Sequence, residues 1–188
     1  MISATIQMQM SAAVEVRLIG PGGAGKSTLG PLLAECLKVT FIDLDRSFSD
    51  RLGDISDYIG RHGYNAYARQ NVEIYCSTLR GASPLCVVAL SSGVMTYAPD
   101  THPEYSRIRR ELEHHPGTFI LLPSFDCDDC VAETVRPANR SSFGRTLSQE
   151  EAVIRARFEI YMAMPMRKIE TMRPISSAMS EIVAALAQ

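Results

Sequence analysis

The segment GPGGAGKST, residues 20–28, constrains the fold of this chain more than any other feature. Its spacing fits the pattern G-x-x-x-x-G-K-[ST], in which glycines let successive backbone N–H groups turn toward one point. An apolar run at 14–19 predicts a strand before it, and residues 26–37 predict a helix after it. Because that helix would point its positive end at the loop, the context favours a nucleotide phosphate site over a plain glycine-rich turn.

The side chains of this loop have separate expected roles. Lys26 would reach the β- and γ-phosphates of a di- or triphosphate, and the Ser27 hydroxyl would ligate Mg²⁺. The expected phosphate contacts come from Gly22, Gly23, Ala24, Gly25, Lys26, Ser27 and Thr28. The leucines expected on one side of the following helix are Leu29, Leu32, Leu33 and Leu37.

Length and charge narrow the class of protein. The chain has 188 residues, which favours one domain over 1–188 with a short tail at 1–12. A net charge of −2 predicts no general attraction to nucleic acid or to an anionic membrane, and no apolar run reaches the length of a membrane span. The first dozen residues lack the pattern of a secretory signal, so we expect a cytoplasmic protein.

The cysteines agree with that expectation. There are five, an odd number, which favours reduced thiols over a disulfide framework. Cys127 and Cys130 form a lone C-x-x-C without a second pair nearby. We interpret them as two cysteines at the start of a helix rather than as a zinc site.

Strands and helices alternate along the chain. Further strands are expected at 39–45, 85–90 and 118–122, and further helices at 54–63, 65–81, 103–117, 148–164 and 176–187. Ser148 is the expected N-cap of the helix at 148–164, with Glu151 at the capping-box position. The pattern predicts an α/β fold with a parallel sheet covered by helices on both faces. Residues 136–147 carry three arginines without periodicity, which fits either a lid or a solvated loop.

Three further motifs follow the loop in a fixed order: FIDLD at 41–45, TVRP at 134–137 and RFEIY at 157–161. With the loop, they make nearly the whole chain resemble the shikimate kinases. The resemblance implies a P-loop kinase fold with a five-stranded parallel sheet and a mobile lid over about 136–147. It also implies transfer of the γ-phosphate of ATP to a ring hydroxyl of shikimate.

The same resemblance implies roles for single residues. Asp43 would help to hold Mg²⁺ through water, and Asp45 would bind and orient, or deprotonate, the acceptor hydroxyl. Arg136 would move in with the lid to the transferring phosphoryl group, and Arg157 would pair with the acceptor carboxylate. Arg173 and Pro174 would lie at the edge of the adenine.

Physical reasoning leaves alternatives open for these residues. Asp43 and Asp45 share a face only if their strand continues, and otherwise they read as helix-cap or turn acids. Arg157 on a helix also suits a surface ion pair with Glu150 or Glu159.

The chain departs from the family pattern in the acceptor half. Ser91-Ser92-Gly93 stands where the family has three glycines. In the family helix motif G-E-x-x-F-R-x-x-E, Ala68 takes the arginine position and neither acid is present. Arg69 lies about 100° further around the helix and could replace that arginine only if the helix shifts or unwinds. The candidate acceptor residues are Asp45, Arg69, Ser92, Gly93 and Arg157.

The sequence therefore predicts an ATP- and Mg²⁺-dependent kinase that acts on a small molecule, with Lys26, Asp45 and Arg136 as its catalytic residues. Shikimate is the first candidate acceptor. The alternatives are a kinase of the same fold for another hydroxy acid or polyol, and a nucleotide-binding interaction module that has lost transfer. We expect a monomer or a weak homodimer.

Overall fold

The computed structural model describes residues 15–81, 85–136 and 146–188. The expected tail at 1–12 and most of the expected lid lie outside the described residues. The elements follow in the order β1 (Glu15–Ile19), α2 (Lys26–Leu37), β2 (Thr40–Asp43), α3 (Leu44–Leu52), α4 (Ile55–His62), α5 (Tyr64–Gly81), β3 (Cys86–Ala89), the short 3₁₀ helix η1 (Val94–Thr96), α6 (Tyr105–His114), β4 (Thr118–Leu122), α7 (Cys127–Thr134), α8 (Leu147–Ala163), β5 (Arg167–Glu170) and α9 (Ile175–Leu186).

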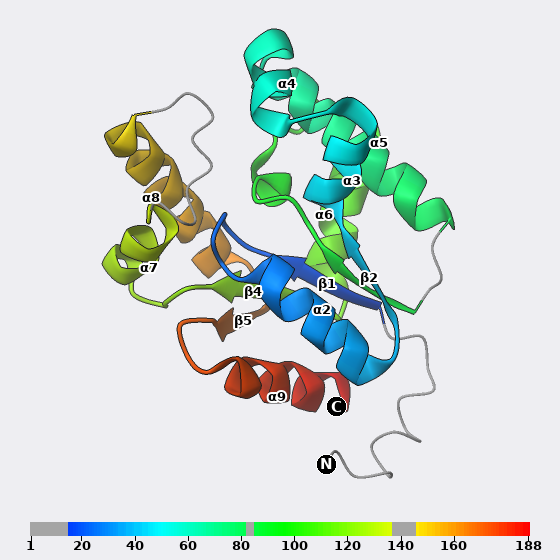
Figure 1. Cartoon of the computed structure of the whole chain (residues 1–188), viewed down its shortest axis with the longest axis vertical. Helices are drawn as coiled ribbons and strands as arrows, with labels where there is room; N and C mark the ends of the chain where they lie inside the picture. Colours follow the sequence, from blue (N-terminus) through cyan, green and yellow to red (C-terminus); the bar gives the residue numbers. More distant parts are fainter. Residues whose placement is uncertain (1–14, 82–84, 137–145) are drawn as a thin grey trace.

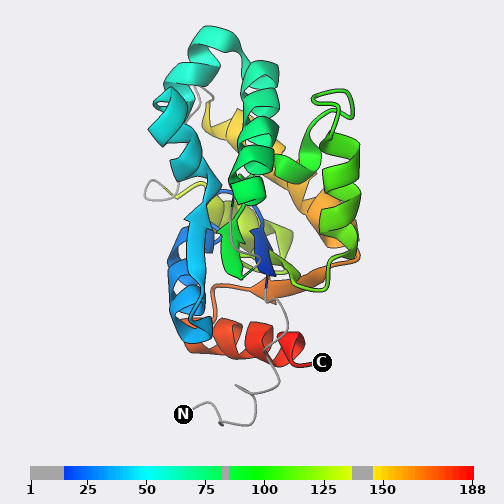
Figure 2. The same cartoon turned by 90° about the vertical axis from the view of Figure 1, so that its right-hand side faces the viewer.

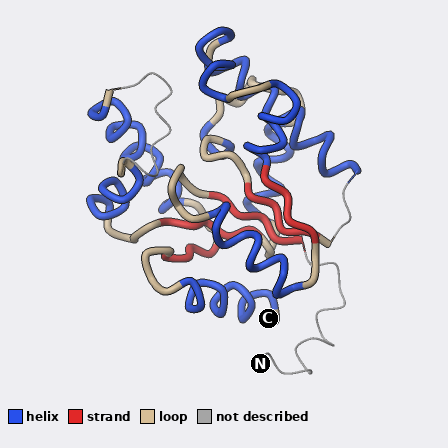
Figure 3. Tube along the Cα trace, viewed as in Figure 1, coloured by secondary structure: helices blue, strands red, loops and turns tan. Residues whose placement is uncertain are grey.

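The five strands form one sheet in the order β2-β3-β1-β4-β5 (Figure 3). Every neighbouring pair is parallel, so all strands end at the same edge of the sheet. The predicted α/β class and five-stranded parallel sheet are confirmed. The strand β5, whose sequence is RKIE, had no counterpart among the strands expected from the residues themselves.

Helices cover both faces of the sheet, as expected (Figures 1 and 2). On one face α2 and α9 pack on Val16, Leu18 and their neighbours, with Leu33 and Ile182 fully buried. On the other face α5, α6 and α8 pack on the strands around Ile19, while α3 and α4 extend this layer beyond the sheet edge. Successive side chains of a strand point to opposite faces of the sheet, so β1 contributes residues to both cores.

Three local expectations were wrong. β2 ends at Asp43 and α3 begins at Leu44, so the strand does not continue to Asp45. The N-cap of α8 is Thr146, which forms a capping box with Gln149, so Ser148 and Glu151 do not have the expected capping roles. Leu32 is 38% exposed and does not share the buried side of α2.

Candidate active site

The loop between β1 and α2 has the backbone shape that its glycines predict. Gly23 and Gly25 adopt positive φ angles of 73° and 80°. Gly20 has φ of 145°, and a Cβ on this residue would lie 2.1 Å from the carbonyl oxygen of Leu121 on the neighbouring strand. Helix α2 begins directly at Lys26, so its free N–H groups open onto the loop. This arrangement is suited to an anion such as a chain of phosphates.

Lys26 lies inside the loop. Its ammonium donates hydrogen bonds to the carbonyl oxygens of Gly20 at 2.7 Å and Pro21 at 2.8 Å. Burial lowers the pKa of Lys26 to about 8, the carboxylates of Asp45 and Asp43 act against this shift, and Arg157 adds to it. The loop carbonyls therefore hold a cation at the place where phosphate oxygens would need one.

Ser27 and Asp43 meet at the carboxyl ends of β1 and β2. The Ser27 hydroxyl donates to Asp43 Oδ2 at 2.7 Å. Asp43 Oδ1 accepts from the backbone N–H groups of Asp45 at 3.0 Å and Arg46 at 3.2 Å, so Asp43 is also the N-cap of α3. The interpretation of Asp43 as a helix-cap acid is therefore confirmed. A hydroxyl and a carboxylate in contact offer oxygen ligands of the kind that Mg²⁺ prefers.

Asp45 lies in the first turn of α3, beside Lys26. Its Oδ1 accepts a 2.5 Å hydrogen bond from the hydroxyl of Ser91, which follows β3. Burial raises the pKa of Asp45, while the Ser91 hydrogen bond and the charge of Lys26 act in the opposite direction. The first residue of the serine pair that replaces the family glycines thus contacts the candidate acceptor carboxylate directly.

Ser91 belongs to a buried chain of polar groups. Asn71 of α5, which is fully buried, donates from Nδ2 to Ser91 Oγ at 2.6 Å. The Tyr97 hydroxyl donates to Asn71 Oδ1 at 3.1 Å. Asn71 stands at the second acid position of the family helix motif. No local sequence pattern predicts these contacts, because Asn71 and Ser91 lie 20 positions apart in the chain.

Arg157 reaches from α8 to the start of α5. Its Nη2 donates to the Tyr64 hydroxyl at 2.9 Å. Tyr64 occupies the first acid position of the family helix motif, so a neutral hydroxyl stands where the family pattern has a carboxylate. Gly93 lies beside this pair, and a Cβ there would be 2.3 Å from the Tyr64 hydroxyl. Arg157 therefore faces the acceptor half of the site rather than belonging only to the surface of α8.

The other two candidate acceptor residues differ in position. Ser92 presents its carbonyl oxygen to the Tyr161 hydroxyl at 2.6 Å, which fixes the backbone beside Gly93. Arg69 is exposed, whereas Ala68 before it is 2% exposed. Helix α5 runs unbroken through both residues, so the shift that would bring Arg69 to the acceptor does not occur. The expectation for Arg69 is therefore wrong on geometry.

A pocket of about 210 Å³ adjoins the phosphate loop on the side of β5 and α9. It is lined by Gly23, Gly25, Thr28, Leu29, Pro123, Glu133, Thr171, Met172, Ile175 and Ala178. Its mixed apolar and polar lining is suited to the base of a nucleotide.

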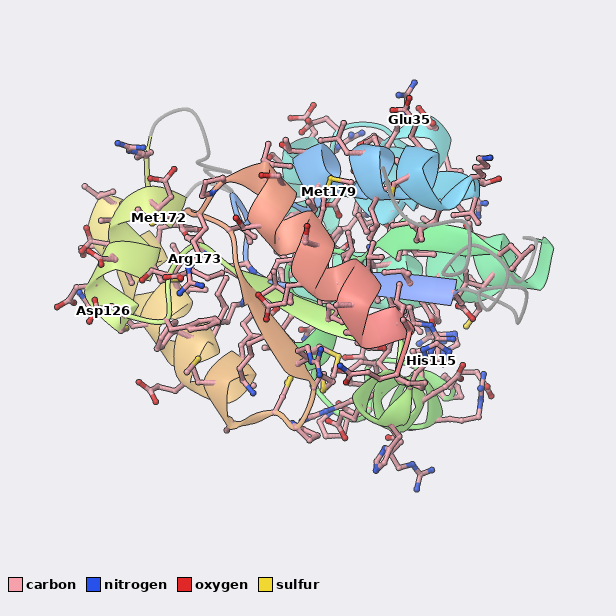
Figure 4. All side chains as sticks on the ribbon, turned by 90° about the horizontal axis from the view of Figure 1, so that it is seen from below. Glu35, His115, Asp126, Met172, Arg173 and Met179 are labelled. Carbon is pink, nitrogen blue, oxygen red and sulfur yellow. The ribbon has the colours of Figure 1, made fainter. Side chains whose placement is uncertain are left out.

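The segment beside this pocket carries Arg173 and Pro174. Figure 4 shows Met172 and Arg173 in the connection between β5 and α9. Arg173 forms an ion pair with Glu170, and Pro174 is the N-cap of α9. Arg136, the first residue of the expected lid, follows α7, is exposed and pairs with Glu133 of the pocket at 2.7 Å. Arg136 and Arg173 therefore both lie close to this pocket, next to Glu133 and Met172 of its lining.

Comparison with known proteins decides the family. The family model for shikimate kinase matches residues 22–187. The chain belongs to the shikimate kinase family. Membership makes it a phosphotransferase that acts on a hydroxyl group and uses ATP as phosphate donor.

Individual shikimate kinases match over most of the chain. A shikimate kinase of Thermobifida fusca is 28% identical over 177 residues, which cover 93% of this chain and 95% of the relative. One of Chlorobaculum tepidum is 33% identical over 138 residues, or 71% of this chain and 66% of the relative. Among solved structures, a shikimate kinase of Acinetobacter baumannii in complex with shikimate has a TM-score of 0.69 at 23% identity, covering 96% of this chain and 94% of that one. At this identity, that likeness concerns the fold.

Two further observations bear on the wider expectations. The cysteines Cys127 and Cys130 lie at the start of α7, as interpreted from the sequence. Within the three described ranges, no helix has both the length and the hydropathy to cross a membrane.

Proposed function

We propose that this shikimate kinase family member transfers the γ-phosphate of ATP to a ring hydroxyl of shikimate. One observation carries the proposal: the Lys26 ammonium lies within electrostatic reach of Asp45, Asp43 and Arg157 at once. The residues suited to bind ATP and those suited to bind the acceptor therefore surround the same ammonium group, that of Lys26. Phosphoryl transfer requires alignment and charge stabilisation more than covalent chemistry from the protein, and this arrangement supplies both.

In the donor half, the loop glycines and the start of α2 hold the phosphates, and Lys26 exchanges its carbonyl partners for phosphate oxygens. Ser27 and Asp43 would hold Mg²⁺. When bound, the metal neutralises charge that develops on the β- and γ-oxygens. Arg173 and Pro174 border the adenine, and Arg136 moves to the transferring phosphoryl group as residues 137–147 close.

In the acceptor half, Asp45 binds the hydroxyl that attacks the γ-phosphate and accepts its proton or orients it. Arg157 pairs with the acceptor carboxylate while one of its N–H groups stays on Tyr64. Ser92 and Gly93 supply backbone next to the bound ring. The chain acts as a single kinase domain over 1–188, as a monomer or a weak homodimer, in the cytoplasm.

A coupled assay of ADP release tests this proposal with shikimate, related hydroxy acids and their methyl esters. We expect shikimate to raise ADP release far above the rate with ATP and Mg²⁺ alone, and its methyl ester to be a poor substrate. Equal rates with the acid and the ester would show that Arg157 does not bind the acceptor carboxylate. They would favour a neutral polyol as the acceptor. ATP binding without any acceptor-stimulated release would favour a nucleotide-binding module without transfer.

Arg157→Lys provides the matched variant for this assay. A lysine keeps the charge but loses the bidentate geometry, so we expect the KM for the acceptor to rise about tenfold or more while the KM for ATP is unchanged. An unchanged acceptor KM would assign Arg157 to a structural contact with Tyr64 alone.

A further inference from the structure

Ser91 stands where the family pattern has a glycine. Its side chain forms hydrogen bonds with Asp45 and Asn71. It is fully buried, and its hydroxyl approaches Asp45 Oδ1 to 2.5 Å. The turn that follows is closed by a 3.1 Å hydrogen bond from the Val94 N–H to the Ser91 carbonyl oxygen, which fixes the backbone from which the hydroxyl projects. A glycine at position 91 would leave this side of Asp45 without its donor.

The directions of the hydrogen bonds that join Asp45, Ser91, Asn71 and Tyr97 follow from their donors and acceptors. A serine hydroxyl has one hydrogen, and an ionised carboxylate only accepts, so the hydrogen points to Asp45. Ser91 Oγ must then accept from the amide nitrogen of Asn71, at 2.6 Å. The oxygen of that amide consequently faces the Tyr97 hydroxyl, which donates to it at 3.1 Å. Asn71 and Ser91 are fully buried and Tyr97 is 4% exposed, so water does not compete for these bonds.

This ordered chain ends on the carboxylate beside the phosphate loop. We propose that Ser91, held by Asn71 and Tyr97, is a positioning residue that fixes the carboxylate of Asp45 against the acceptor hydroxyl. The proposal rests on the proposed function, in which Asp45 contacts that hydroxyl. The hydrogen bond to Oδ1 restricts rotation of the carboxylate. Small displacements of an aligning group are costly in phosphoryl transfer, and about 1 Å can cost roughly a hundredfold in rate.

The two charged side chains that influence the pKa of Asp45, Lys26 and Asp43, are bound to other groups. Lys26 is bound to the loop carbonyls of Gly20 and Pro21, and Asp43 is bound to Ser27 and to the start of α3. Tyr67 of α5 adds a second hydrogen-bonding hydroxyl next to Asp45. Ser91 is the partner that the rest of the buried chain holds in a defined direction.

Ser91→Ala and Ser91→Thr test the proposal in steady-state kinetics with ATP and shikimate. We expect Ser91→Ala to lower kcat about tenfold or more, with less than a threefold change in the KM for shikimate and no change in the KM for ATP. Ser91→Thr, which keeps the hydroxyl, should restore most of the rate. Tyr97→Phe removes only the outermost hydroxyl and should cause a smaller loss, about threefold.

Thr118→Val is the matched control, because it removes a buried hydroxyl that has no hydrogen-bond partner among the described residues, at the opposite end of the sheet. It should leave all kinetic constants unchanged. Kinetic constants of Ser91→Ala within twofold of those of Thr118→Val would overturn the proposal. The proposal would also be overturned if Ser91→Thr lowers kcat as much as Ser91→Ala does, because loss of the hydroxyl would then not explain the lower kcat. If Ser91→Ala does not fold, the kinetic constants of Tyr97→Phe are compared with those of Thr118→Val instead. A difference of less than twofold would then overturn the proposal.

Crystal structures of the wild type and Ser91→Ala separate this proposal from the proposed function. We expect one carboxylate orientation for Asp45 in the wild type and a rotated or divided one in the variant. If shikimate is not phosphorylated but the carboxylate moves in this way, the proposed function fails and the positioning role stands. An identical Asp45 in both structures would refute the positioning role whatever the substrate.

Discussion

Asp43 performs two roles with two different oxygens, and two substitutions can separate them. Oδ1 caps α3 through the N–H groups of Asp45 and Arg46, and Oδ2 accepts from the Ser27 hydroxyl. Asp43→Asn keeps an acceptor for the cap but removes the charge next to Ser27. Asp43→Ala removes both. Since asparagine and aspartate cap helices about equally well, the difference between the two variants measures the cap, and their common effect measures the charge.

The expected magnitudes follow from these contacts. Loss of an N-cap costs about 1 kcal/mol, so Asp43→Ala should lower the unfolding midpoint by about 2–4 °C in a chain of 188 residues. Asp43→Asn should unfold within about 1 °C of the wild type. Both should lower kcat about tenfold or more, equivalent to about 1.4 kcal/mol of transition-state stabilisation, and raise the Mg²⁺ concentration needed for half-maximal rate.

Thermal unfolding without nucleotide and coupled ADP release over a Mg²⁺ titration measure the two effects separately. The reasoning would be refuted if Asp43→Asn loses as much stability as Asp43→Ala, because the cap would then depend on the charge. It would also be refuted if Asp43→Asn keeps the wild-type rate and Mg²⁺ dependence, because Asp43 would then be a cap only.

Four further predictions concern the phosphate loop and the lid. Lys26→Met should lower kcat about a hundredfold or more with an unfolding midpoint near that of the wild type, and near-normal turnover would remove Lys26 from the mechanism. Burial lowers the pKa of Lys26 to about 8, so its charge is lost above that pH. ATP affinity, measured by calorimetry, should therefore fall above that pH by at most about tenfold per pH unit; constant affinity to pH 10 would contradict the assignment. Gly20→Ala should destabilise by about 2–4 kcal/mol in urea unfolding, since its Cβ would meet a carbonyl oxygen at 2.1 Å, whereas Gly22→Ala, with open space around it, should cost less than about 1 kcal/mol. Arg136→Ala should lower kcat more than it raises the acceptor KM, and the reverse pattern would assign Arg136 to ground-state binding.

The donor half of the site could be predicted from the sequence because its residues are neighbours in the chain. The loop from Gly20 to Thr28 forms its own backbone shape, and its glycines with positive φ are required there by local geometry alone. The strands β3 and β4 were equally readable because each is a buried apolar run, and β1 was readable from its apolar residues Val16, Leu18 and Ile19.

The elements that were missed lack such local signals. In β5 only Ile169 is buried, between charged residues that fit a loop equally well. The acids of FIDLD fit a strand end, a turn or a helix start, and only the structure shows that Asp43 caps α3. At the start of α8, Thr146 and Ser148 are both good capping residues, and the reach of Gln149 to the Thr146 backbone decides between them.

The acceptor half was the least predictable because its contacts are long-range. The hydrogen bond between Ser91 and Asp45 joins residues 46 positions apart, and that between Arg157 and Tyr64 joins residues 93 positions apart. From the sequence, Ser91 and Tyr64 could be recognised only as departures from a family pattern. Their effect depends on the partners that the fold brings to them.

The central claim is transfer from ATP to a shikimate hydroxyl, and mass spectrometry of the products tests it most directly. The protein is incubated with ATP, Mg²⁺ and shikimate, and ADP and phosphorylated shikimate are counted in the same sample, with Lys26→Met alongside. We expect one shikimate monophosphate for each ADP in the wild type and little of either in the variant. ADP that accumulates without phosphorylated shikimate, or product that forms equally with Lys26→Met, would contradict it.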